Sequence, residues 1–257
     1  MEEKEMIEKV ELIINELKEL TKKECYKMVI SDEKAKITDS KIGGVPYTPE
    51  GEEFVKNEQG DVIPLFVQIN FDGIELENYP NKGILQLFIN NASELWPADY
   101  KIRFYDDISK PARTDFPELD YSNHFVEEEI KINLEKIISY MPHGDFRFKN
   151  LFDEIYSKYF GTTIDWYDIE EETGYSVDKF LEAFYTDCGN VGGYADFTQT
   201  DPRDDDSDLV ECLFKVDSTM DFNRLMIGDS GIAWLLISEE DLKNKKFENA
   251  SFDWDCC

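Results

Sequence analysis

The densest group of residues that could do chemistry is a run of carboxylates in the second half of the chain. Residues 200–208 read Thr-Asp-Pro-Arg-Asp-Asp-Asp-Ser-Asp. Carboxylate oxygens are preferred ligands of Ca²⁺ and Mg²⁺, but the central glycine and the twelfth-position glutamate of an EF-hand loop are missing. We therefore expect a solvated acidic loop over 201–208 and no dedicated metal site, with weak calcium or magnesium binding as the alternative.

A second candidate is the tetrapeptide Gly228-Asp229-Ser230-Gly231, which resembles the start of the nucleophile segment GDSGG of trypsin-like serine proteases. The fifth residue here is Ile232. A serine nucleophile also needs a histidine base and an oxyanion hole, and the spacing predicts neither. We expect this segment to lead into a strand.

Two double glycines, Gly43-Gly44 and Gly192-Gly193, each precede a segment that contains an aromatic residue. Glycine permits a positive φ and a close approach of the backbone, so each pair is either a tight turn or the wall of a ligand pocket. Neither pair fits the GxGxxG or GxxxxGK[ST] patterns of nucleotide sites. We favour structural turns at six glycines: Gly43, Gly44, Gly83, Gly192, Gly193 and Gly231.

Polar residues beside these turns are the candidate ligand-binding residues, namely Gln68, Asn70, Gln199, Asp201 and Arg203. Ligand sites favour interfaces between domains, so a pocket between two halves of the molecule would suit them. With 57 acidic residues, no single carboxylate pair stands out for acid–base catalysis. The sequence therefore assigns no catalytic residue and indicates no cofactor.

Histidine and cysteine usage argues against zinc and histidine chemistry. The two histidines, His124 and His143, lie in the middle of the chain, and no CxxC pair occurs. Scattered cysteines indicate free thiols in a reducing cytoplasm. A cytoplasmic location is also expected because the sequence shows no signal-peptide pattern and no apolar run long enough to span a membrane. The five are Cys25, Cys188, Cys212, Cys256 and Cys257.

Charge is the most unusual property of the composition. The chain has 57 acidic and 27 basic residues, for a net charge of −30. Such a surface repels phosphate backbones and anionic lipids, so nucleic acid and membranes are not expected partners. A basic protein is the more plausible partner, although the acidity also suits simple solubility. The oligomeric state is not specified.

The elements that must position these residues form an internal repeat. Four blocks recur in the same order, and Gly43 precedes Gly192 by 149 positions, while Gly83 precedes Gly231 by 148. Alternation of apolar and polar residues predicts strands over 65–70, 100–104, 212–217 and 251–256. Continuous apolar runs predict strands buried on both faces over 84–89 and 232–237. Each half therefore offers at least three strands.

Helices are expected outside these blocks. Apolar residues recur at helical spacing over 3–24, and amphipathic patterns occur over 147–160 and 176–187. Residues 123–140 carry apolar residues in mixed spacing and are taken as part of a helical middle segment. Helices before and between strand-rich units are typical of an α+β protein.

The blocks resemble the YwqG-like family of bacterial proteins of unknown function. In the first half the resemblance rests on Gly43-Gly44-Val45-Pro46-Tyr47, on 65–70 and on 79–89. In the second half it rests on 191–194, on 197–203 and on Asp229-Ser230-Gly231, so it spans residues 40–257. The resemblance implies an α+β bacterial protein and brings no catalytic residue.

We thus expect an α+β fold with an internal duplication of a β-rich unit. The expected parts are an N-terminal helix (1–25), a first β-rich repeat (26–117), a helical connector (118–188) and a second β-rich repeat (189–257), packed as one globule. The absence of catalytic motifs and the charge of −30 favour a non-enzymatic protein-binding module of the inhibitor or immunity-protein kind. The alternative is a small-molecule binder or enzyme with a pocket between the repeats.

Overall fold

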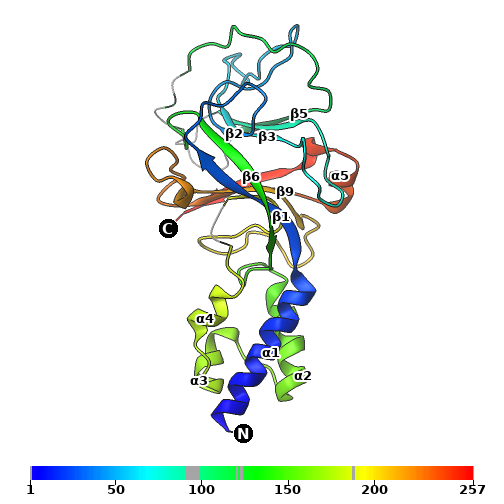
Figure 1. Ribbon diagram of the computed structural model, residues 1–257, viewed down its shortest axis with the longest axis vertical. Helices are drawn as coiled ribbons and strands as arrows, with labels where there is room; N and C mark the ends of the chain where they lie inside the picture. The colour runs from blue at the N-terminus through cyan, green and yellow to red at the C-terminus, as the bar shows by residue number, and fades with distance from the viewer. Residues whose placement is uncertain (1, 91–98, 120, 122–123, 187–188, 257) are drawn as a thin grey trace.

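The chain forms a β-rich body from which a group of helices projects at one end (Figure 1). The structure, a computed structural model, describes residues 2–90, 99–119, 121, 124–186 and 189–256. Two of the five cysteines considered above, Cys188 and Cys257, lie outside the described residues. Both chain termini are far apart, with the N-terminus at the tip of the helical part (Figure 1).

The helical part is held together by its own apolar core. It contains α1 (Glu3–Thr21), α2 (Phe148–Phe160), η1 (Trp166–Asp168), α3 (Ile169–Thr173) and α4 (Val177–Glu182). Helix α1 buries Val10, Ile13, Ile14 and Leu17, which recur every three or four residues and so share one face. That face packs against α2 and α3. The predicted helices at 3–24 and 147–160 are confirmed as α1 and α2, although α1 ends at Thr21, while in the segment 176–187 the helix α4 covers only Val177–Glu182.

The described strands of the body form one antiparallel sheet in the order β10-β9-β8-β7-β1-β6-β2-β3-β4-β5. The first five are β1 (Lys23–Ser31), β2 (Lys41–Ile42), β3 (Leu65–Asn70), β4 (Ile84–Ile89) and β5 (Tyr100–Tyr105). The others are β6 (Ile130–Ser139), β7 (Asn190–Gly192), β8 (Glu211–Asp217), β9 (Ile232–Ile237) and β10 (Ser251–Asp255). The short helices η2 (Ser218–Met220), α5 (Glu239–Lys243) and η3 (Phe247–Asn249) lie between the last strands.

The strand order is symmetric about the central pair β1–β6. We call β2–β5 the first half-sheet and β7–β10 the second half-sheet. Each pairs its strands in sequence order, and each has a register irregularity in its second strand, between Leu65 and Val67 and between Cys212 and Phe214. Strands β4 and β9 are buried along their whole length, as their apolar runs predict.

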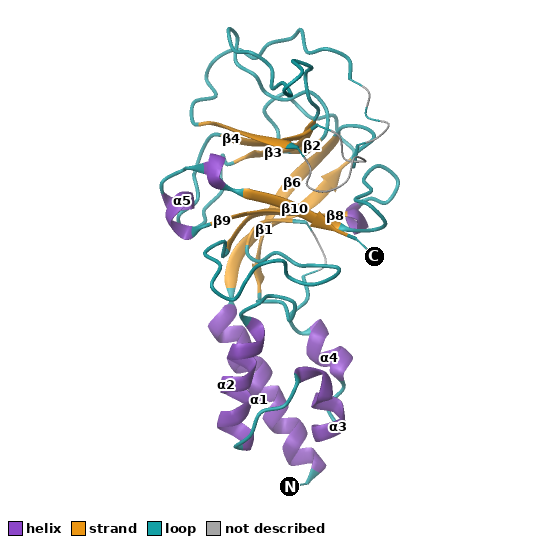
Figure 2. Ribbon diagram, turned by 180° about the vertical axis from the view of Figure 1, so that it is seen from behind, coloured by secondary structure: helices purple, strands orange, loops and turns teal. Residues whose placement is uncertain are grey.

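The main core lies between the two half-sheets, which fold over one another (Figure 2). The rings of Phe66 on β3 and Phe252 on β10 have centroids 6.1 Å apart. The two edge strands lie near each other: the Tyr100 hydroxyl on β5 donates at 3.3 Å to the carbonyl of Ala250, the residue before β10. The sheet is therefore nearly closed. None of the described helices has the length and apolar character needed to cross a membrane.

The glycines taken as turns occupy backbone that other residues rarely adopt. Five of the six have positive φ, for example +76° at Gly44, and Gly231 is the exception. A Cβ at Gly44 would meet the Glu129 side chain, and one at Gly231 would meet the Asp255 carbonyl oxygen. At these glycines another segment packs directly on the backbone, so a side chain would not fit without a shift of its neighbours.

The expectation of a wholly helical middle segment was wrong for residues 130–139. They form β6, which pairs with β1 along nine residues from Lys23↔Ser139 to Ser31↔Lys131. The reason is visible in the side chains: Ile130 and Ile132 alternate with polar residues, and β-branched residues favour strands. The connector between the half-sheets therefore contributes a central strand, and its helices begin only at Phe148.

Candidate functional site

The first two predicted ligand-binding residues are engaged within the first half-sheet. Gln68 is fully buried, and its Nε2 donates to the carbonyls of Ile37 at 2.9 Å and Asp39 at 2.8 Å. Its Oε1 accepts from the backbone N–H of Tyr47 at 2.9 Å. Asn70 Nδ2 donates to the Thr38 carbonyl at 2.9 Å. Both side-chain amides lie on β3 and hold the segment that precedes β2.

The other three lie in the loop that follows Gly193, over the second half-sheet. Arg203 Nε and Nη2 donate to the two carboxylate oxygens of Asp201 at 2.8 and 2.6 Å. Its Nη2 also donates to Asp145 at 3.0 Å, and its Nη1 donates to the Leu209 carbonyl at 2.8 Å. Gln199 Nε2 donates to the Cys256 carbonyl at 2.7 Å. The structure thus pairs Asp201 with Arg203, places Gln199 in the same loop against the end of β10, and places Gln68 and Asn70 elsewhere.

The Arg203 cluster joins this loop to the helical part. The side chains of Arg203, Asp201 and Asp145 are 4 %, 5 % and 1 % exposed, so all three charges are buried. The guanidinium lies over the ring of Phe146, 4.7 Å from its centroid. Burial by itself would raise the pKa of Asp145, but hydrogen bonds from Arg147 and the charges of Arg147 and Arg203 hold it below its ordinary value.

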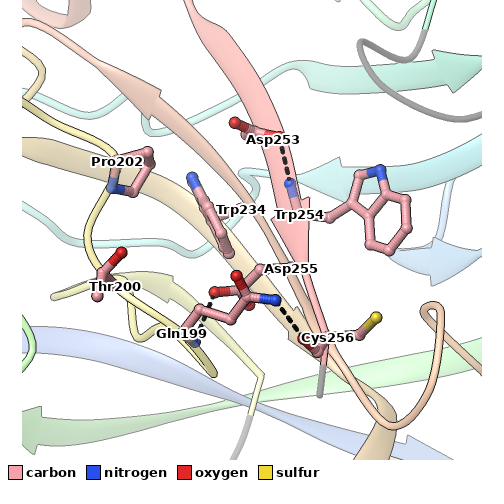
Figure 3. A pocket seen from close by; sticks show the side chains of 8 residues that line it. All are labelled: Gln199, Thr200, Pro202, Trp234, Asp253, Trp254, Asp255 and Cys256. Carbon is pink, nitrogen blue, oxygen red and sulfur yellow. Dashed lines mark hydrogen bonds between the residues drawn. The ribbon is translucent and has the colours of Figure 1, made fainter.

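A cavity of about 300 Å³ opens beside this loop, on the outer face of β9 and β10 (Figure 3). Trp234 of β9 faces it, with Asp253 and Asp255 of β10 on the same side of the sheet (Figure 3). Trp254 contributes from the same strand, but its indole points to the other side, as alternation along a strand requires (Figure 3). The opposite wall is formed by Gln199, Thr200 and Pro202.

A second cavity of about 390 Å³ adjoins the first and shares Pro202, Trp234 and Asp253 with it. It adds the exposed carboxylates of Asp204 and Asp206 from the acidic loop. We call the two cavities together the Trp234 groove. Its defining residues are Gln199, Thr200, Pro202, Asp204, Asp206, Trp234, Asp253 and Asp255.

Local hydrogen bonds fix the shape of the Trp234 groove. The Asp255 carboxylate accepts from the Thr198 hydroxyl at 2.7 Å, from the Thr198 N–H at 3.1 Å and from the Gln199 N–H at 2.9 Å. The Trp234 indole packs edge-on against Phe197, with centroids 4.8 Å apart. The loop is therefore tied to β10 at one end and held by Arg203 at the other.

The Trp234 groove is lined by several carboxylates, while the Trp234 side chain that contributes to its wall is itself only 2 % exposed. Carboxylates attract cations and form charge-assisted hydrogen bonds with them. Within the described residues, no group of three or more histidine, cysteine or acidic side chains has an arrangement suited to a metal ion. The carboxylates of the acidic loop have different surroundings: Asp201 binds Arg203, while Asp204 and Asp206 line the groove.

A separate cavity of about 330 Å³ lies at the junction of the two half-sheets and the start of β1. It is lined by Lys22 and Lys23, by the segment 76–79 and by residues that include Glu211 and Glu239. Lys23 Nζ donates to Glu211 at 2.8 Å. This cavity holds charges of both signs and contains none of the five predicted ligand-binding residues.

The serine of the GDSG segment occupies a turn. Ser230 has a φ of +59° just before β9. The histidines are engaged elsewhere: the His124 ring packs against Phe66 and Tyr121, and the His143 ring packs against Trp166 with centroids 4.7 Å apart. Neither contact involves Ser230, in agreement with the expectation that this segment leads into a strand.

Sequence reasoning missed Trp234, Asp253 and Asp255 as candidate site residues. The alternation of Asp253 and Asp255 with Trp254 was a usable signal, because it places both carboxylates on one face of a strand. Trp234 was hidden in an apolar run, and only the register of β9 with β10 sets it opposite Asp253.

Comparison with known proteins gives a family but no activity. A family model described as "Domain of unknown function (DUF1963)" matches residues 40–256, which include every strand except β1. No curated protein matches the chain.

Proposed function

This chain belongs to the DUF1963 family of unknown function, and we propose that it is a non-enzymatic binding module whose ligand is a basic segment of a partner protein. The observation that carries the proposal is the Trp234 groove, where the carboxylates of Asp204, Asp206 and Asp253 line the same cavity of about 390 Å³. Two of these carboxylates, Asp204 and Asp206, belong to exposed residues.

The overall charge supports the same proposal. A net charge of −30 creates a field that attracts a basic partner and accelerates its association. The groove adds a defined place for individual cationic side chains, which a diffuse acidic surface lacks. Binding is therefore expected to depend on salt, since exposed charges are screened over a Debye length of about 10 Å at 0.1 M.

The test uses a fluorescently labelled peptide that contains arginine and lysine, titrated with the full chain at low and high salt. The double variant Asp204→Asn/Asp206→Asn removes the two exposed groove carboxylates and is expected to weaken binding about fivefold, or about 1 kcal/mol. The matched control is Asp205→Asn, because Asp205 is exposed in the same loop but does not line the groove. If the loss of peptide affinity per charge removed is the same in the groove variant and in the control variant, a localised site is refuted.

A second candidate function is binding of a small molecule in the cavity between the half-sheets. Its volume of about 330 Å³ and its mixture of lysine and glutamate side chains suit a small zwitterion. A thermal-shift screen with free amino acids tests this candidate. Glu239→Gln is expected to reduce a positive shift, while Glu240→Gln, on the same short helix but outside the cavity lining, leaves it unchanged.

We also propose that the two half-sheets arose by duplication of one unit. The sequence offsets of 147 to 149 positions, the symmetric strand order and the matching irregularities in β3 and β8 support this proposal. The bacterial YwqG-like assignment, the cytoplasmic location and the absence of nucleic-acid and membrane partners are proposals that rest on the residues and charge given above.

A further inference from the structure

The loop that carries the exposed carboxylates of the Trp234 groove is closed by one guanidinium. The two carboxylates belong to Asp204 and Asp206. Arg203, which precedes them, donates through Nη1 at 2.8 Å to the carbonyl of Leu209, which follows them. Within the closed loop the Ser207 N–H donates to the Asp204 carbonyl at 2.9 Å. The way in which these two carboxylates face the groove therefore depends on where Arg203 is held.

Arg203 is held from outside the loop by the segment that precedes α2. Its Nε and Nη2 bind Asp201, but Asp201 belongs to the same loop and moves with it. The Asp145 carboxylate accepts from Arg203 Nη2 at 3.0 Å. The N–H of Phe146 donates to the Asp201 carboxylate at 2.9 Å. These two hydrogen bonds tie the loop to the segment before α2.

Asp145 is itself fixed by the helical part. Its carbonyl accepts at 2.8 Å from the N–H of Phe148, the first residue of α2, and the Phe148 side chain is fully buried in the helical core. Its carboxylate accepts from Arg147 Nε and Nη2 at 2.8 and 2.7 Å. The Asp145 side chain is 1 % exposed and lines neither cavity of the groove, so a ligand in the groove does not touch it.

We propose that Asp145 is a positioning residue for the Trp234 groove, through which the helical part sets the affinity of the groove for its basic ligand. The inference rests on the proposed function and adds the control of that site. Asp145 holds Arg203, and Arg203 closes the loop that presents the exposed carboxylates. Groups that are already in place bind a ligand more tightly, because binding does not have to order them. The link is buried, so water competes little with its hydrogen bonds.

The first test compares two variants of the full chain in binding of the labelled peptide that contains arginine and lysine, at low salt. Asp145→Asn keeps the shape of the side chain and removes the charge that holds Arg203, so we expect about fivefold weaker binding. Asp153→Asn is the control, because it removes the same charge from a residue of α2 that pairs with Lys149. A charge outside the link acts only through the screened field, and we expect a loss of less than about twofold.

The second test needs no variant and measures amide hydrogen exchange in the original chain with and without saturating peptide. Coupling between two sites is reciprocal, so a peptide in the groove also stabilises the link to Asp145. We expect the peptide to slow exchange of the Phe146 N–H, which donates to Asp201, by up to about fivefold. The reference is the Gly161 N–H at the end of α2, which donates to the Ser157 carbonyl at 2.8 Å. Its exchange is expected to change less.

Failure of the groove and failure of its control by Asp145 give different results. If the original chain binds no peptide, both the proposed function and this inference are overturned. If the peptide binds but Asp145→Asn weakens binding no more than Asp153→Asn does, the inference is overturned and the proposed function stands. Exchange at Phe146 that the peptide slows no more than exchange at Gly161 has the same meaning. If Asp145→Asn does not fold, the exchange measurement decides.

Discussion

Arg103 and Asp253 hold the same place in the two half-sheets, one opposite Gln86 and the other opposite Trp234, and they carry opposite charges. Arg103 donates a hydrogen bond to the Glu53 carbonyl of the loop beside β5 at 2.6 Å. Asp253 lines the Trp234 groove. The same framework therefore carries an arginine bound to a loop in one half and a candidate binding face in the other.

The Arg203 cluster is expected to contribute more to stability than any exposed ion pair. Arg203→Met would leave Asp201 and Asp145 buried beside each other with one charge partner fewer, and the expected loss is about 3–5 kcal/mol in the free energy of unfolding. Urea denaturation measures it. Lys149→Met is the control, because Lys149 pairs with Asp153 at the surface of α2, where such pairs contribute less than about 1 kcal/mol. Similar losses in the two variants would contradict this role of the cluster.

Buried His124 is expected to make the fold less stable in mild acid. Burial lowers the pKa of His124 from 6.5 to about 4. The unfolded chain therefore takes up a proton below about pH 6.5 that the folded chain refuses until about pH 4, so stability falls as the pH falls through this window. The full difference corresponds to about 3 kcal/mol.

The check is the free energy of unfolding of the original chain and of His124→Phe, each measured between pH 7 and pH 4. The aromatic replacement keeps ring contacts with Phe66 and Tyr121 and removes the titrating group. Carboxylates titrate in both proteins, so the difference between the two curves isolates His124. Parallel curves would show that the imidazole is not held neutral by the fold.

Gly44 is expected to tolerate alanine less well than Gly51 does. Both have positive φ, +76° and +88°, so both substitutions incur a backbone cost of about 1–2 kcal/mol. Only at Gly44 would the new Cβ also meet the Glu129 side chain, 2.8 Å from its Cβ, and Glu129 is the partner of buried Lys41. Thermal or urea unfolding should therefore rank Gly44→Ala as the more destabilising change, and the reverse order would count against the close approach.

Local patterns predicted most elements but not how they come together. Apolar spacing predicted α1, which buries one face. Alternation predicted strands at β3 and β8, although both strands are buried on both faces. Residues 130–139 were misjudged because their strand pattern is mixed, and pairing with β1 decides the outcome. The groove could not be predicted, since Trp234 and Asp253 become neighbours only through the register of β9 and β10.

The central claim is that a basic segment binds in the Trp234 groove, and the most direct measurement is the NMR signal of the Trp234 indole N–H during titration with an arginine-containing peptide. The signal is assigned with Trp234→Phe, and Trp166, which packs against His143 in the helical part, is the internal reference. We predict a saturable shift of the Trp234 signal over the same concentrations that give binding, with the Trp166 signal unchanged. Peptide binding that leaves the Trp234 signal in place would contradict the account.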